Sequence, residues 1–276
     1  MSRKSILITG CSSGIGLSCA RVMRDRGWQV IATVRTAEDA ARLSAEGLAA
    51  PLLDYADPQS IATAWEETMD LTGGTLDALF NNGAYAVPGA VEDLPREALR
   101  AIFEANVFGW HDLTRRAIPV MRRQGHGRII QNSSVLGFAA LRWRGAYVAT
   151  KFALEGLTDT MRLELSDTPI HVSLIEPGPV TSRIRANSIP HFEKWIDWKA
   201  SARKDQYESE LIQRLYVEGP KDRFELPPER VADKLIHACE SPRPRPRYFV
   251  TTPTWIMAAV QRLLPSRARD AVARRV

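Results

Sequence analysis

The stretch Thr9-Gly10-Cys11-Ser12-Ser13-Gly14-Ile15-Gly16 joins a short apolar run at 5–9 to an amphipathic stretch at 14–25. Glycine permits a positive φ and lets the backbone approach a ligand without a Cβ clash. The free N–H groups and the positive dipole end of a helix N-terminus attract a pyrophosphate. A glycine-rich turn between the first strand and the first helix therefore predicts a nucleotide site made of Gly10, Ser12, Ser13, Gly14, Ile15 and Gly16.

Short apolar runs alternate with longer amphipathic stretches along the rest of the chain. Strands are predicted at 5–9, 29–34, 50–53, 78–81, 128–133, 171–175 and 248–251. Helices are predicted at 14–25, 38–45, 58–71, 96–123, 146–165 and 228–240. Strands that are apolar on both faces are typical of a parallel sheet covered by helices. The pattern predicts one α/β domain, 1–276, with a doubly wound (Rossmann) seven-stranded parallel sheet and helices on both faces.

Two segments depart from this alternation. Residues 182–225 form a long insertion with aromatic side chains among many charges, including Phe192, Trp195 and Trp198. Because it follows the carboxyl end of a strand, we expect a helical substrate lid; a helix pair packed on the core is the alternative. Residues 252–276 are predicted to be a basic helical tail. Its apolar part could contact a membrane surface, but packing on the core or on a sister subunit is the favoured interpretation.

Composition and charge narrow the class of protein. The 276 residues are 45% hydrophobic and 25% charged, which is typical of a globular domain. No apolar run approaches the ~20 residues that cross a bilayer, and no signal-peptide pattern begins the chain, so we expect a cytoplasmic protein. The three cysteines and five histidines show no metal-ligand spacing, and no metal is predicted. The net charge of +5 is concentrated in the tail, so nucleic acid is not an expected partner.

Tyr147 and Lys151 are four residues apart in a predicted helix and so share one of its faces. A free tyrosine has a pKa near ~10, and a nearby ammonium in a partly dry site can lower that pKa. Ser134 lies thirteen residues before Tyr147, at the carboxyl end of a predicted strand, where substrates bind in open parallel sheets. A hydroxyl there can donate to a carbonyl oxygen that gains negative charge.

The end of the second predicted strand, Thr33-Val34-Arg35-Thr36, lacks the acidic residue that would accept hydrogen bonds from ribose hydroxyls. Arg35 can instead pair with a 2′-phosphate through its planar guanidinium, and the Ser12 hydroxyl can add a hydrogen bond. The residues therefore favour NADP(H) over NAD(H), although a solvated arginine is the alternative interpretation of Arg35.

Six motifs, taken together and in this order, resemble the short-chain dehydrogenase/reductase family. They are the glycine turn, Asn81-Asn82-Gly83-Ala84, Asn106-Val107-Phe108-Gly109, Ser134, the Tyr147/Lys151 pair and Pro177-Gly178-Pro179-Val180-Thr181. The family usually has N-N-A-G where this chain has N-N-G-A, so that turn is expected to differ slightly. Phrases around the glycine turn and Lys151 resemble the 17β-hydroxysteroid and retinol dehydrogenases, which weakly supports a lipophilic alcohol or ketone as substrate.

The resemblance implies four catalytic residues. Tyr147 would be the general acid in reduction and the base in oxidation. Lys151 would lower the pKa of Tyr147 and hold the nicotinamide ribose, Ser134 would orient the carbonyl, and Asn106 would hold a water that relays protons through Lys151. A non-catalytic NADPH-binding redox sensor is the alternative, although a sensor has no need of this set.

The resemblance also implies contacts to the cofactor and an assembly. Asp54 would bind the adenine, and Asn82 and Gly83 would line the adenosine ribose. The loop after the sixth strand would meet the carboxamide end through Pro177, Gly178, Val180 and Thr181. Homodimers and homotetramers are usual in the family, so a homo-oligomer is expected.

Overall fold

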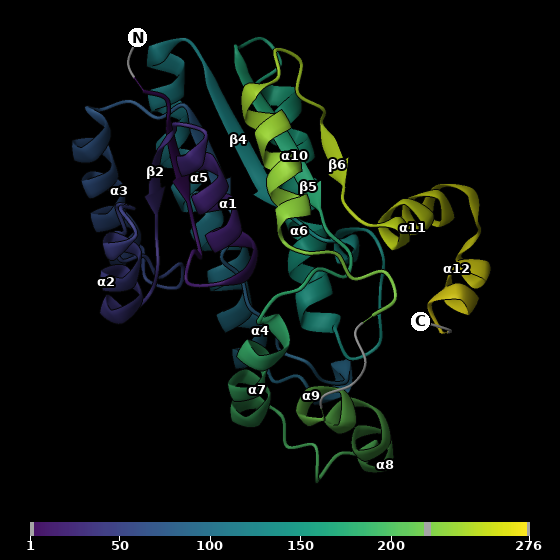
Figure 1. The fold of residues 1–276 in the computed structure, drawn as a ribbon. Helices are drawn as coiled ribbons and strands as arrows, with labels where there is room; N and C mark the ends of the chain where they lie inside the picture. Colours follow the sequence, from purple (N-terminus) through teal and green to yellow (C-terminus); the bar gives the residue numbers. More distant parts are fainter. Residues whose placement is uncertain (1–2, 218–221, 275–276) are drawn as a thin grey trace.

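The computed structural model describes residues 3–217 and 222–274, and its centre is a parallel sheet (Figure 1). The strands are β1 (Ser5–Ile8), β2 (Gln29–Ala32), β3 (Ala78–Asn81), β4 (Gly127–Asn132), β5 (Ile170–Glu176) and β6 (Arg247–Phe249). Their order is β2-β1-β3-β4-β5-β6, with Leu7 opposite both Ile31 and Leu79. The strand order reverses between β1 and β3, and ligands bind beyond the carboxyl ends at such a switch point.

The sheet has six strands among the described residues, so the prediction of seven is wrong. The predicted strand at 50–53 forms only isolated bridges to the β2 side, Ile31 to Ala49 and Val34 to Leu52. The Ala32 N–H donates to the Ala49 carbonyl at 2.7 Å, and the Val34 N–H donates to the Pro51 carbonyl at 3.2 Å. The next bond of a regular ladder would need the N–H of residue 51, which proline lacks.

Helices cover both faces of the sheet, as predicted. The first face packs against α1 (Gly14–Asp25), α2 (Ala37–Ala45) and α10 (Glu229–Glu240), with Ile6, Ile8 and Phe80 at the centre of its core. The second face packs against α3 (Pro58–Thr72), α5 (Gly109–Gln124) and α6 (Gly145–Glu164), around Leu7, Leu79 and Ile129. These alternating strand residues divide the apolar core into two layers.

The single helix predicted at 96–123 is interrupted. It consists of α4 (Arg96–Phe103), a π-helical turn (Glu104–Phe108) and α5. A Cβ at Gly109 would lie 2.3 Å from the Tyr55 carbonyl oxygen, so glycine is needed where the helix begins again. A π-helical turn inside a helix often marks a functional site, and this one contains Asn106.

The insertion at 182–225 folds into helices beyond the carboxyl ends of the strands (Figure 1). They are α7 (Ile184–Trp195), α8 (Lys204–Gln206), a π-helical turn (Tyr207–Ile212) and α9 (Gln213–Tyr216); residues 218–221 lie outside the described part. Phe192 and Tyr207 are buried with Val87 and Ile102 in a third apolar cluster. The Tyr207 hydroxyl donates to Asp93 and accepts from the Ala90 N–H, both at 2.8 Å. Much of the insertion is therefore packed on α4 and the loop after β3.

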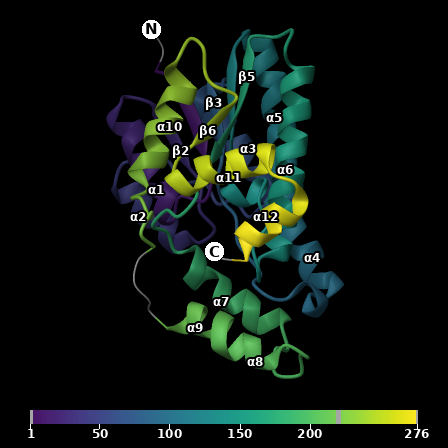
Figure 2. The same cartoon turned by 90° about the vertical axis from the view of Figure 1, so that its right-hand side faces the viewer.

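The remaining elements are short helices near the carboxyl edge and the C-terminal pair. They are the 3₁₀ turns Val91–Asp93 and Val135–Gly137, and the helices α11 (Thr252–Leu263) and α12 (Ser266–Ala273). Figure 2 shows α11 and α12 lying together beside the sheet, so the described part of the predicted tail is helical. Among the described residues, no helix is long and apolar enough to span a bilayer.

Three prolines precede the outer strand β6. Pro242, Pro244 and Pro246 alternate with arginines on the approach to β6. The N–H of Arg245 donates to the Tyr248 hydroxyl at 2.8 Å, and the N–H of Arg243 donates to the Ser241 hydroxyl at 3.2 Å. In the segment before the short strand β6, the N–H groups of Arg243 and Arg245 are therefore already hydrogen-bonded.

Candidate active site

A cavity of about 1820 Å³ opens at the carboxyl edge of the sheet. Most of the sequence-predicted site residues line it: Gly10, Ser12, Ser13, Gly14, Ile15, Arg35, Asp54, Asn82, Gly83, Ser134, Tyr147, Lys151, Pro177, Gly178, Val180 and Thr181. Gly16 and Asn106 are not among the residues that line it. The fold thus brings residues from seven separate segments to one cavity.

The glycine turn is packed closely against its own backbone and the turn after β3. Gly10 has a φ of +68°, and a Cβ there would come within 2.6 Å of the Gly83 Cα. A Cβ at Gly16 would lie 2.3 Å from the Gly10 carbonyl oxygen. The side chain of Ser13, the N-cap of α1, makes no capping hydrogen bond. The first N–H groups of α1 therefore face a space that suits a pyrophosphate.

The turn after β3 is fixed by residues that the sequence did not single out. The Tyr55 hydroxyl donates to the Asn81 side chain at 2.5 Å, and the Trp110 indole N–H donates to the Gly83 carbonyl at 2.7 Å. Asn82 donates to the Thr9 carbonyl at 2.9 Å, which ties this turn to the glycine turn. In sequence, Tyr55 and Trp110 look like ordinary core aromatics, and no spacing marks them.

Tyr147 lies in the first turn of α6 and is 8% exposed. Burial raises its pKa well above the usual range, whereas the Arg144 guanidinium and the Ser134 hydroxyl act to lower that pKa. The Lys151 Nζ lies 5.5 Å from the centre of the Tyr147 ring, so Arg144 and Lys151 are both cations near the phenol. Ser134 accepts a hydrogen bond from the Leu136 N–H at 3.1 Å and so caps the 3₁₀ turn after β4.

Lys151 lies one turn further along α6 and is 1% exposed. Its Nζ donates to the Asn132 carbonyl at 2.8 Å and lies 4.3 Å from the centre of the Trp110 ring. Burial lowers the pKa of Lys151 to about 7, and the negative charge of Glu155 opposes that shift. The amine can therefore change its charge near neutral pH.

The Asn106 side chain is buried in the π-helical turn. Its Nδ2 donates to the Tyr85 carbonyl at 2.9 Å and to the Thr150 hydroxyl at 3.3 Å, and its Oδ1 accepts from the Tyr85 N–H at 3.2 Å. The amide thus holds the loop after β3 against α6, next to the Tyr147–Lys151 turn. Its role in a proton relay stays a prediction.

A buried cluster of charges continues the same face of α6. Arg247 of β6 binds Glu155 at 2.5 Å, Asp159 at 2.7 Å and also Glu176, which is 0% exposed. Burial, together with the charge of Glu155, raises the pKa of Glu176 to about 8. Burial also raises the pKa of Glu155, and the two carboxyl groups titrate as a pair.

Around the end of β2, Arg35 forms no ion pair with any residue that the structure describes, whereas Asp39 is bound by Arg42 at 2.8 Å. Asp54 accepts a hydrogen bond from the Ala56 N–H at 2.9 Å.

Tyr85 also lines the cavity, and its ring stacks on that of His191 in α7 with centroids 3.9 Å apart. The sequence did not indicate this stack, because its two rings come from distant segments.

Gly178 is packed closely rather than free to hinge. A Cβ there would lie 2.2 Å from the Thr251 hydroxyl oxygen, and its φ is not positive. The loop between β5 and the insertion therefore needs glycine for close approach to the start of α11.

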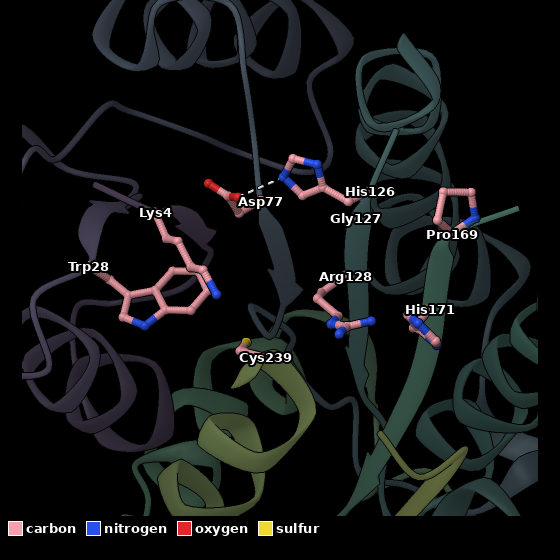
Figure 3. Close-up of a pocket in the computed structure, with 9 residues that line it drawn as sticks. All are labelled: Lys4, Trp28, Asp77, His126, Gly127, Arg128, Pro169, His171 and Cys239. Atoms are coloured by element: carbon pink, nitrogen blue, oxygen red, sulfur yellow. Dashed lines mark hydrogen bonds and ion pairs between the residues drawn. The ribbon is translucent and has the colours of Figure 1, made fainter. Parts of the chain in front are cut away.

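A second, smaller cavity of about 300 Å³ lies at the opposite, amino-terminal edge of the sheet (Figure 3). Its lining includes Lys4, Trp28, Arg128 and His126, and the His126 ring is 2.9 Å from the Asp77 carboxylate. None of the sequence-predicted site residues lines it. The carboxyl edge of the sheet is therefore the candidate active site.

Comparison with known proteins places the chain in a family. Residues 4–192 match the family model for short chain dehydrogenases. An uncharacterized oxidoreductase of Escherichia coli, YbbO, is 39% identical over 272 residues, which cover 98% of this chain and 94% of that protein. Human 17-beta-hydroxysteroid dehydrogenase type 1 is 34% identical over 91% of this chain and 78% of its own length.

The architecture also matches solved structures. A short chain dehydrogenase/reductase from Burkholderia phymatum, solved in complex with NAD, aligns with a TM-score of 0.77 and 23% identity over 94% of this chain and 92% of that chain. The family match, the E. coli and human relatives and the site geometry agree with one another. The chain belongs to the short-chain dehydrogenase/reductase family of oxidoreductases.

Proposed function

We propose that this protein transfers a hydride between NADP(H) and a secondary alcohol or ketone with a lipophilic body. The observation that carries the proposal is that Ser134, Tyr147 and Lys151 line the same cavity as the glycine turn. A non-catalytic sensor of the cofactor would need the turn but not these three side chains.

The residues present fit a nicotinamide dinucleotide. The N-terminus of α1, whose N-cap Ser13 makes no capping hydrogen bond, suits the pyrophosphate, and Arg35 suits a 2′-phosphate. Asp54 and Gly83 would contact the adenosine, and Val180 and Thr181 the nicotinamide end. The cofactor, when bound, supplies or accepts the hydride.

The chain's own groups handle the proton. Ser134 donates to the substrate carbonyl oxygen and orients it, and Tyr147 gives its phenolic proton to that oxygen in reduction and removes it in oxidation. Arg144 and, when charged, Lys151 stabilise the phenolate that remains. Burial of Tyr147 keeps the proton on the phenol until the oxygen develops charge.

Apolar side chains line the part of the cavity beyond Tyr147. They come from the loop after β4, from the insertion and from α11: Leu136, Ala139, Leu141, Ile189, Leu215, Val217 and Met257. Such walls favour a substrate with an apolar body.

The first test follows the absorbance of NADPH with a panel of ketones. Tyr147→Phe should bind NADPH as the unaltered protein does and lose about 10²–10⁴-fold in turnover, the range that general acid–base catalysis contributes. Cofactor binding is measured separately by NADPH fluorescence. Near-normal turnover of this variant on a substrate whose chemistry limits the rate would show that Tyr147 is not the acid.

Arg35→Asp tests the cofactor assignment. The aspartate would repel a 2′-phosphate and accept ribose hydroxyls, so the ratio of kcat/KM for NADPH over NADH should fall by at least about tenfold. Arg21→Gln, whose arginine binds Glu46 at 2.8 Å and does not line the cavity, serves as the control and should change the ratio less. An unaltered ratio in Arg35→Asp would exclude Arg35 as the 2′-phosphate ligand.

We also propose that part of the insertion at 182–225 closes over the bound substrate as a lid. Residues 182–187 are mostly exposed and line the cavity, unlike the packed Phe192. Hydrogen exchange of these amides should slow only when cofactor and substrate analogue are both present. Full protection in the free protein would identify a fixed subdomain instead.

A further inference from the structure

Three arginines from different elements line the cavity that also contains Ser134 and Tyr147. Arg144 directly precedes α6, Arg185 belongs to α7, and Arg214 belongs to α9. They are close enough that Arg185 and Arg214 both disfavour the charged form of the Arg144 guanidinium. Arg144 is the N-cap of α6, and its charge acts to lower the pKa of Tyr147 in the first turn of that helix.

These arginines have no carboxylate partners among the residues that the structure describes. Arg142, two residues before Arg144, pairs instead with Glu210 at 3.2 Å, outside the cavity lining. Neighbouring acids are engaged elsewhere: Glu193 accepts from the Tyr216 hydroxyl, and Glu225 accepts from Thr181. Asp222 and Glu225 also line the cavity, but no described carboxylate lies within ion-pair distance of the three guanidinium groups.

Arg144 is partly buried, which makes the missing partner costly. Burial lowers its pKa to about 10, so the guanidinium is still charged at neutral pH. An unpaired charge removed from water destabilises the folded state. A group perturbed in this way inside a cleft is a candidate for ligand binding.

The backbone before Arg144 is strained. Trp143 has a φ of +65°, which is unusual for a residue other than glycine. Its carbonyl accepts from the Gly89 N–H at 3.0 Å, its indole donates to Glu210 at 2.9 Å, and its ring packs on Tyr207 with centroids 4.7 Å apart. Surroundings that impose such a conformation are common at ligand sites, and here they fix the residue next to Arg144.

We propose that the substrate carries a carboxylate, which binds the Arg144 guanidinium between Arg185 and Arg214 while the ketone lies at Ser134 and Tyr147. The substrate class is then an oxo acid, or the matching hydroxy acid, with an apolar body. The inference rests on the proposed function for the position of the ketone. The cofactor's own phosphates are accounted for separately, by the glycine turn and Arg35. A planar guanidinium suits a carboxylate because it can donate two parallel hydrogen bonds.

The first experiment measures binding without turnover. Decanoate and decanamide, which share an apolar body and differ in charge, are titrated into the protein–NADPH complex while tryptophan fluorescence is recorded. Decanoate should bind at least about tenfold more tightly than decanamide, as expected for a charge-assisted hydrogen bond. Arg144→Gln should abolish that preference, and Arg142→Gln, the matched control, should keep it. Equal binding of the two ligands to the unaltered protein would overturn the proposal.

The second experiment measures turnover of a medium-chain oxo acid and of its methyl ester. In the unaltered protein kcat/KM should be higher for the acid, mainly through KM, and Arg144→Gln should remove the difference. An equal loss for acid and ester would mean that Arg144 acts only on Tyr147, and the proposal would be wrong. If neither compound is reduced, the result contradicts the proposed reduction of such a ketone. The fluorescence titration still decides whether the site binds a carboxylate.

Discussion

Two groups of charges adjoin the Tyr147 turn of α6, and they are built in opposite ways. On the side toward β6, Glu155, Glu176 and Asp159 all meet Arg247. On the cavity side, Arg144 faces Arg185 and Arg214, with no acid among the described residues to pair with them. The acids of the first group share a cation within the protein, although one buried oxygen each of Glu155 and Glu176 has no hydrogen-bond partner among the described residues. The arginines of the second group line the cavity without a carboxylate partner in the described chain.

The difference indicates that the first group stabilises the fold, whereas the second is available to bind a ligand. A buried ion is tolerated when its partners are present, and removing one partner leaves the others uncompensated. An ion that lacks a partner in the folded chain costs stability and is retained where a ligand uses it. Substitutions in the two groups should therefore have opposite effects on stability.

The largest effect is expected from Arg247→Leu. It leaves Glu155, Glu176 and Asp159 without their shared cation, and because Arg247 is partly exposed we expect a loss of about 3 kcal/mol in the free energy of unfolding. Urea denaturation measures it, with Arg243→Leu as the exposed control. The loss should shrink toward pH 5, because Glu155 and Glu176, whose pKa values are raised by burial, take up protons as the pH falls. A loss that is the same at both pH values would contradict the electrostatic interpretation.

An intermediate effect is expected from Glu155→Gln on the pH dependence of carbonyl reduction. Lys151 is charged below its pKa of about 7 and neutral above it, so kcat/KM should fall as the pH rises through that value. Removing the negative charge of Glu155 lowers the pKa of Lys151 further, and the fall should begin about one pH unit lower. Asp159→Asn, one turn further away and more exposed, should shift it much less. Superimposable pH profiles for Glu155→Gln and the unaltered protein would show that Glu155 does not affect the pKa of Lys151.

The smallest effect is expected from Arg144→Gln on stability. Because the guanidinium has no partner in the described chain, its removal should leave the free energy of unfolding unchanged or raise it by up to about 1 kcal/mol. Thermal unfolding without ligand measures this effect. A marked loss of stability would show that Arg144 has a structural partner and would weaken the contrast between the two groups.

Much of the fold followed from periodicity, because buried parallel strands and amphipathic helices leave strong patterns. The predicted limits of α1 match those of the structure, and the other long helices differ by a residue or so, apart from the stretch around Asn106. There the helical pattern runs on, while the hydrogen bonding changes to a π-helical turn. The prediction of a seventh strand was wrong because Pro51 lacks the N–H that a regular ladder needs. An apolar sequence pattern does not show the loss of one N–H.

The site was predicted where a chemical motif fixes both residue type and spacing, as for Tyr147 and Lys151. Tyr55 and Trp110 were missed, since an aromatic that holds a turn has the same sequence appearance as one that fills the core. Arg144, the N-cap of the helix that carries Tyr147, was also missed. Its lack of a partner depends on where distant acids lie, and only the folded chain shows that.

The proline-flanked ends of the sheet bear on how this protein behaves at high concentration. An outer strand with unpaired backbone groups can template pairing with another molecule and lead to aggregation. At one edge, Pro51 breaks the ladder that would have extended the sheet. At the other, the N–H of Arg245 is taken by Tyr248 and charged arginines alternate with prolines. Neither border offers a long regular strand to a second copy, so growth of intermolecular sheets from the native state is disfavoured at both.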